Sequence, residues 1–240
     1  MSDEHIVSSF DEDMDQLRGL LLEMGRIVSS QLRAATQALR QEDRDLAKQV
    51  MAGDKQLNEL ELELNDLAIN ILALRQPFAS DLRQVVTTLK SAGHFERMGD
   101  LAGNIAQRTN TITKAEAEKG SIETLVHMSD TVQIMTNSIL TAYERSDAEM
   151  AQEVRAQDVT VDKLHNTLFR EMLTYMMEDP RNISGCMHVM FMAKNIERMG
   201  DRVADIAKEL IYMKTGDWPE EKRVKRDKTS RIIVEPDSEV

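Results

Sequence analysis

Acidic side chains recur at helical spacing in two separate parts of this sequence. Glu96 and Asp100 lie four residues apart within the stretch ERMGD. The same five letters return at Glu197–Asp201, with Asp205 four residues further on. Residues four apart share one face of a helix, with Cβ atoms about 5–6 Å from each other. Such rows of carboxylate oxygens are what hard divalent cations, or iron, require from a helical protein.

Matching rows occur earlier in the chain, upstream of each copy of ERMGD. Asp54 precedes Asn58 by four residues, and Asp158 precedes Asp162 by four. If these rows lie on neighbouring helices, their oxygens can face those of the ERMGD helices. The predicted metal ligands are therefore Glu96, Asp100, Glu197, Asp201, Asp205, Asp54, Asp158 and Asp162, with Asn104 extending the first row. The pattern does not distinguish iron, zinc, magnesium, manganese and nickel.

A ladder of surface ion pairs is the alternative explanation of the same spacing. Arg97 lies three residues before Asp100, and the second copy repeats the arrangement, but each such pair contributes only about 0.2–0.5 kcal/mol. Gly99 and Gly200 favour the metal hypothesis, because glycine inside a helix costs roughly 1 kcal/mol relative to alanine. A crowded ligand site, or the close approach of a neighbouring backbone, would account for that cost.

Apolar residues follow a helical rhythm along most of the chain. The 240 residues contain only ten glycines and four prolines, which favours long helices over strands. The prediction is an all-α protein with six helices near residues 8–40, 43–75, 81–113, 121–145, 147–177 and 182–214.

These helices form two copies of one three-helix unit. A shift of 101 residues lays His94–Gln107 on Asn195–Lys208, and a shift of 104 aligns the preceding helices. The predicted organisation is two tandem, pseudo-symmetric three-helix bundles at residues 8–113 and 121–214. A charged, disordered tail is predicted at 215–240, where Trp218 could pack the start of the tail on the last helix.

Composition excludes several classes of function. The net charge of -12 argues against a nucleic-acid partner, and no apolar run is long enough to cross a bilayer. A single cysteine, Cys186, is expected to be an inert core thiol in a cytoplasmic protein. His94, His165 and His188 are interpreted as structural residues. The sequence has no phosphate-binding glycine loop, and no glutamate is followed three residues later by histidine, so an enzyme is not expected.

The duplicated unit and its ERMGD motif resemble the PhoU family of phosphate-transport accessory proteins. The stretches at Arg75–Arg83, Arg44–Glu61 and Tyr175–Ile183 are also similar to that family, and the resemblance covers residues 8 to 213. It implies paired three-helix bundles whose acidic rows bind multinuclear metal clusters in some members. Asn58 and Asn104 depart from a full carboxylate set, so the site of the first repeat is expected to be the weaker one.

The resemblance also implies a regulatory role. Family members repress the phosphate-starvation response when phosphate is plentiful and limit phosphate uptake. Their implied partners are the ATPase subunit of the phosphate ABC transporter and a phosphate-sensing histidine kinase, with contact to the membrane only through those partners. A homodimer is expected. A metal-storage or metal-sensing protein is the alternative function, and a metal-dependent hydrolase is a weaker third.

Overall fold

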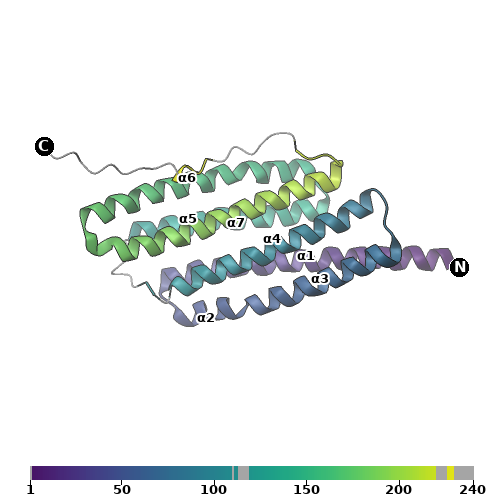
Figure 1. Cartoon of the computed structure of the whole chain (residues 1–240), viewed down its shortest axis with the longest axis horizontal. Helices are drawn as coiled ribbons and strands as arrows, with labels where there is room; N and C mark the ends of the chain where they lie inside the picture. The colour runs from purple at the N-terminus through teal and green to yellow at the C-terminus, as the bar shows by residue number, and fades with distance from the viewer. Residues whose placement is uncertain (1, 110, 113–118, 220–225, 230–240) are drawn as a thin grey trace.

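The computed structural model describes residues 2–109, 111–112, 119–219 and 226–229, and in them the chain is helical. Two groups of helices run side by side along the long axis of the molecule (Figure 1). The first group consists of α1 (Ser2–Gln41), α2 (Arg44–Ala52), α3 (Asp54–Arg75) and α4 (Ser80–Thr109). The second consists of α5 (Lys119–Arg145), α6 (Ala148–Glu178) and α7 (Ile183–Thr215), with a short 3-10 turn, η1 (Pro180–Asn182), before α7. The all-α prediction is confirmed.

The helix predicted over residues 43–75 is divided in two at Gly53. The backbone there stays in the right-handed region, at φ -71°, but the helix is broken between α2 and α3. A Cβ atom at this position would lie 2.9 Å from Nε2 of Gln31 on α1. Glycine, which has no Cβ atom, leaves room for the Gln31 side chain. The break makes Asp54, one of the predicted ligands, the first residue of α3.

The two groups of helices repeat each other in local detail. Asp43 accepts hydrogen bonds from two backbone N–H groups at the start of α2, and Asp147 accepts one at the start of α6. These aspartates are partners under the shift of 104 residues, and each caps free backbone donors. The residues before them, Glu42 and Ser146, both have positive φ angles, 57° and 52°. The second repeat therefore preserves the backbone geometry of the first at this turn, although α6 has no break like the one at Gly53.

One hydrophobic core runs through both repeats. Helix α4 packs against α7, and α1 packs against α5, as well as against the helices of their own repeat. Phe95 of α4 is 1% exposed within this core. The hydroxyl groups of Thr88 on α4 and Tyr143 on α5 form a buried hydrogen bond of 2.5 Å between the repeats. Burial raises the pKa of Tyr143 to about 12, so the phenol stays protonated in this contact.

The chain turns back on itself after α7. Gly216 ends the helix with φ 82°, a left-handed conformation that glycine adopts readily. Trp218 then stacks on Tyr212 with ring centroids 4.0 Å apart, which confirms the predicted packing of the start of the tail. Residues 220–225 and 230–240 of the predicted disordered tail lie outside the described residues, as do residues 113–118 around the junction of the two predicted bundles. Cys186 is buried, as predicted. None of the described helices is both apolar and long enough to cross a membrane.

Candidate metal sites on the acidic rows

The first acidic row brings α3 and α4 together through their carboxylates. Asp100 lies within hydrogen-bonding distance of Asp54, so two oxygens of opposite rows approach each other as predicted. The carboxylate of Glu96, one turn before Asp100 on α4, lies close enough to both aspartates for their charges to repel it. The Asn58 amide donates to Oδ2 of Asp54 at 3.3 Å and so orients that carboxylate.

Negative charge accumulates in this row without an equal positive charge beside it. Partial burial, the charge of Asp54 and its hydrogen bond raise the pKa of Asp100. Partial burial raises the pKa of Glu96, and the neighbouring carboxylates raise it further, although Arg97 opposes them. Oδ1 of Asp54 is buried and has no hydrogen-bond partner among the described residues. A cation bound between α3 and α4 would relieve the repulsion and would satisfy that oxygen.

Glu61 also belongs to this row, although sequence reasoning overlooked it. Its charge raises the pKa of Glu96, and its Oε1 atom lies 3.6 Å from where a Cβ atom of Gly93 would stand. Glu61 follows Asp54 by seven residues, which is two helical turns and therefore the same face of α3. That spacing was the signal that could have identified it.

The second acidic row is more deeply buried than the first. Asp158 and Asp162 on α6 are 1% and 0% exposed, and Glu197 on α7 is 1% exposed. A lysine from the same helix enters this row, because Nζ of Lys194 lies 2.8 Å from Oε2 of Glu197. Sequence reasoning overlooked Lys194, whose counterpart under the shift of 101 residues is Gly93. The second row therefore contains its own counter-charge.

Asp201 and Asp205 lie further along α7, and both are half-buried. The carboxylate of Asp205 is 3.4 Å from the Arg202 guanidinium. It also lies close to His94 of α4, where its charge partly offsets the lowering of the His94 pKa by burial. Asp205 thus lies beside the first repeat, whereas Glu197 is paired with Lys194.

The two ERMGD glycines have different neighbours. A Cβ atom at Gly99 would lie 2.6 Å from Cδ1 of Leu57 on α3, so this glycine allows close side-chain packing. A Cβ atom at Gly200 would lie 3.0 Å from Oδ1 of Asp158, within the second acidic row. In neither case is a neighbouring backbone the nearest obstacle. Only Gly200 fits the hypothesis of a crowded ligand site.

The eight predicted ligands are therefore only partly brought together. Among the described residues, no three histidine, cysteine, aspartate or glutamate side chains converge closely enough to form a ready coordination sphere. Metal binding stays a prediction, supported by the oxygen donors and by a buried oxygen in each row that has no hydrogen-bond partner among the described residues, Oδ1 of Asp54 and Oδ1 of Asp162. The charge balance favours the first row as the stronger cation site, the reverse of the order expected from Asn58 and Asn104, because Lys194 neutralises part of the second.

Replacing Asp100 with asparagine is expected to stabilise the metal-free protein at pH 7 by about 0.3–1 kcal/mol, since it removes repulsion that solvent already screens. The raised pKa of Asp100 means that its charge opposes folding above that pKa. The gain should shrink as the pH falls through the raised pKa and vanish below the ordinary value of 3.8. Urea denaturation from pH 7 to pH 3 measures it.

Asp45→Asn is the matched control, because Asp45 is exposed and forms an ion pair with Lys48 at 2.9 Å. This pairing lowers the pKa of Asp45, so the control variant should gain no stability at pH 7. Destabilisation of the metal-free protein by Asp100→Asn would contradict the repulsion between α3 and α4.

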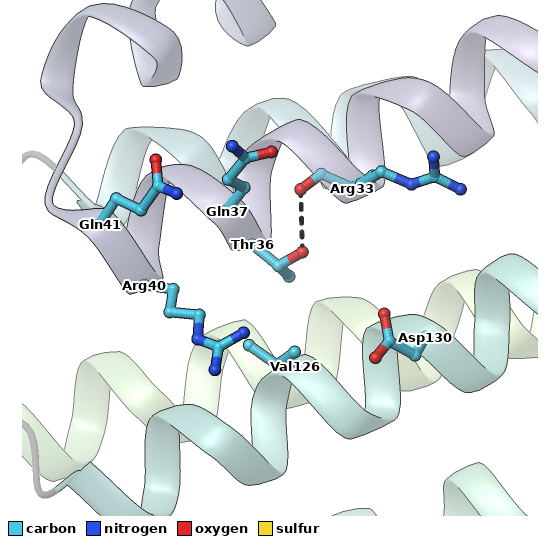
Figure 2. Close-up of a pocket in the computed structure, with 7 residues that line it drawn as sticks. All are labelled: Arg33, Thr36, Gln37, Arg40, Gln41, Val126 and Asp130. Atoms are coloured by element: carbon cyan, nitrogen blue, oxygen red, sulfur yellow. Dashed lines mark hydrogen bonds between the residues drawn. The ribbon is translucent and has the colours of Figure 1, made fainter.

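A separate pocket of about 260 Å³ opens between α1 and α5 (Figure 2). Its two arginines already have partners in the protein. Nε of Arg33 donates to Oε1 of Gln133 at 2.8 Å, and Arg40 pairs with Glu123 at 3.2 Å. Asp130 adds a negative charge to the lining. The pocket therefore offers little unbalanced positive charge to an anion such as phosphate. Its lining residues are Arg33, Thr36, Gln37, Arg40, Gln41, Val126 and Asp130.

Comparison with known proteins agrees with this duplicated helical architecture. The PhoU domain profile matches the chain twice, at residues 21–109 and 125–210. The chain is 38% identical to a phosphate-specific transport system accessory protein PhoU homolog of Rhizobium meliloti (strain 1021), over 97% of this chain and 98% of the relative. It is 41% identical to the homolog of Zymomonas mobilis, over 92% of this chain and 93% of the relative.

Solved structures show the same fold. The crystal structure of PhoU from Pseudomonas aeruginosa superposes with a TM-score of 0.83 at 37% identity, covering 87% of this chain and 100% of that one. The phosphate transport system regulatory protein PhoU from Streptococcus pneumoniae gives a TM-score of 0.82 at 25% identity, covering 88% and 100%. The fold and the acidic rows define a protein built from two copies of a three-helix unit. The chain belongs to the PhoU family.

Proposed function

We propose that this protein regulates phosphate uptake and represses the phosphate-starvation response when phosphate is plentiful. It acts as an adaptor between the ATPase subunit of a phosphate-importing ABC transporter and a phosphate-sensing histidine kinase. The observation that carries the proposal is sequence identity of 38% and 41%, over nearly the whole chain, to relatives named as accessory proteins of the phosphate-specific transport system. The adaptor is cytoplasmic, forms a homodimer, catalyses no reaction and reaches the membrane only through its partners.

Large apolar side chains on the surface support a role in docking. Leu74 and Phe78, where α3 leads toward α4, are 77% and 86% exposed. On α7, Ile183, Met187 and Phe191 are exposed at successive spacings of four residues, which places them along one helical face. Exposed apolar groups gathered in this way are typical of protein-binding surfaces.

Deletion of the gene tests the regulatory role. In medium rich in phosphate, the deletion strain is expected to express phosphate-starvation genes that the parent strain represses, and a plasmid copy should restore repression. Transcript levels in high and low phosphate measure the effect. Unchanged expression after deletion would refute the proposal. Capture of the ATPase subunit and of the kinase by the tagged protein, in the same cells, tests the two partners separately.

A metal-binding function is the second candidate, favoured by the approach of Asp54 to Asp100 across α3 and α4. Alanine at Glu197, Asp201 and Asp205 should be compared with a matched variant carrying alanine at Asp54, Glu96 and Asp100. Bound metal and repression are measured together in both variants. Loss of bound metal with intact repression would show that signalling does not need metal in the acidic rows. Loss of both would show that signalling depends on the acidic rows.

A further inference from the structure

A short segment of the predicted tail returns to the protein and lies against α6 and α7. This segment, Arg226–Thr229, is named the strap here. Its backbone is held by two side chains of α6. The N–H of Arg226 donates to Oδ2 of Asp162 at 2.6 Å, the carbonyl of Arg226 accepts from the Asn166 amide at 2.6 Å, and the N–H of Lys228 donates to Oδ1 of Asn166 at 2.9 Å.

Asn166 therefore binds the strap much as a neighbouring β-strand would. Its side-chain amide has one acceptor and a donor group, which match a carbonyl and an N–H on either side of Asp227. Contacts of this kind recognise an extended backbone whatever its side chains are. The selectivity must come from the residue between the two contacts.

Asp227 supplies that selectivity. Its Oδ2 atom accepts from Nζ of Lys194 at 2.7 Å, and its Oδ1 atom lies 3.6 Å from Nδ1 of His165. The N–H and hydroxyl of Thr229 donate to the same Oδ1 at 2.9 and 2.8 Å, which fixes the carboxylate within the strap. These hydrogen bonds and the Lys194 charge outweigh the effect of burial and lower the pKa of Asp227.

Lys194 joins the strap to the second acidic row. Its ammonium lies between Asp227 at 2.7 Å and Glu197 at 2.8 Å, so one cation bridges a tail residue and a buried carboxylate of α7. Although burial lowers the pKa of Lys194, its hydrogen bonds to these two carboxylates raise it overall. The bridge keeps Lys194 charged beside Glu197.

The first repeat lacks the residues that hold the strap. Under the shifts of 104 and 101 residues, Asn166 corresponds to Leu62 and Lys194 to Gly93. His165 corresponds to Glu61, and a carboxylate at this position would repel Asp227. The binding features are therefore specific to the second repeat, although the helices that carry them are duplicated.

We propose that α6 and α7 form a docking site for an extended peptide with a central aspartate, and that this chain's own Arg226–Thr229 occupies it. The strap covers Asp162 and anchors Lys194 against Glu197. The second acidic row is thereby closed by the protein's own tail, whereas the first repeat lacks the residues that hold the strap. The site binds the peptide backbone through Asp162 and Asn166, and the aspartate through Lys194.

Amide hydrogen exchange of the full chain tests docking directly. In the wild type, the amides of Arg226 and Lys228 should exchange at least about tenfold more slowly than in a free peptide of the same sequence. Asn166→Ala should abolish the protection of the Arg226 backbone amide. This amide donates to Asp162, so the substitution does not remove its own hydrogen-bond acceptor. Asn70→Ala, at an exposed position of α3, is the matched control and should leave the protection intact.

Free-peptide exchange rates in the wild type would overturn the proposal, and so would a protected Arg226 amide in Asn166→Ala. Protection that rises with protein concentration would also overturn it, because the occupant would then be the tail of a second copy. If the chain's own tail occupies the site, the protection should stay the same across a hundredfold dilution. Such a dilution would weaken association between two copies by about 2.7 kcal/mol.

Competition with a synthetic peptide tests the specificity of the site. Excess VKRDKTSR, the sequence of residues 224–231, should speed exchange of the wild-type strap amides as it displaces them. The same peptide with Asp227→Asn should compete at least about tenfold less well, since it lacks the charge that Lys194 binds. Equal competition by the two peptides would refute the assigned role of Asp227.

Discussion

Phe95→Ala is expected to destabilise the protein by about 3–5 kcal/mol, the typical effect of emptying a phenylalanine site in a well-packed core. Phe95 is 1% exposed, and its ring lies 2.9 Å from where a Cβ atom of Gly25 would stand. The ring therefore packs directly on the α1 backbone, where a rigid helix can fill little of the cavity. Urea denaturation followed by helical circular dichroism measures the loss.

Phe78→Ala is the matched control, because Phe78 is 86% exposed and its removal opens no cavity. The expected change is within about 0.5 kcal/mol. A similar loss of stability in both variants would show that phenylalanine content, and not the buried position of Phe95, is responsible. A loss below about 1 kcal/mol for Phe95→Ala would contradict the packing of α4 against α1.

Lys194→Met should destabilise the protein by about 1–3 kcal/mol, less than the full effect of breaking a buried ion pair because Lys194 is partly exposed. The substitution keeps the apolar stem and removes the charge that pairs with Glu197 and Asp227. Glu197 is 1% exposed, so solvent cannot replace the missing ammonium. The free energy of unfolding of the metal-free protein at pH 7 is the quantity to measure.

A double-mutant cycle isolates this pair. Combining Lys194→Met with Glu197→Gln should restore part of the loss, because the second change removes the unpaired charge. Lys163→Met, at an exposed position of α6, should have little effect and serves as the control. Strictly additive losses in the double variant would show that Lys194 and Glu197 do not interact.

Much of the fold could be predicted because the sequence repeats itself. The shift of 104 residues places Asp43 on Asp147, and both begin helices as N-caps. The contact of Gly53 with Gln31 could not be predicted locally, since the φ of Gly53, -71°, is helical and the side chain that approaches it comes from another helix. Hydrophobic periodicity describes which residues are buried, but it does not locate such contacts between helices.

The candidate site was predictable only in part. The spacing of Asp54 and Asp100 on their helices indicated two facing rows, and the structure brings these two carboxylates together. Glu61 continues the same helical face and could have been included. The pairing of Lys194 with Glu197, three residues apart on one helix, could also have been included. The contact of Lys194 with Asp227 could not, because Asp227 lies 33 residues later in a charged segment that composition alone assigns to solvent.

The core shared by α1, α4, α5 and α7 has a consequence for the origin of this architecture. If one three-helix unit existed alone, its α1 and α4 faces would lie open to water, together with the buried apolar side chains that α5 and α7 now cover. Such an ancestor would have had to pair with a second molecule of itself before the two genes were fused. Within this one chain, the contact of Thr88 with Tyr143 crosses the interface that two such units would share.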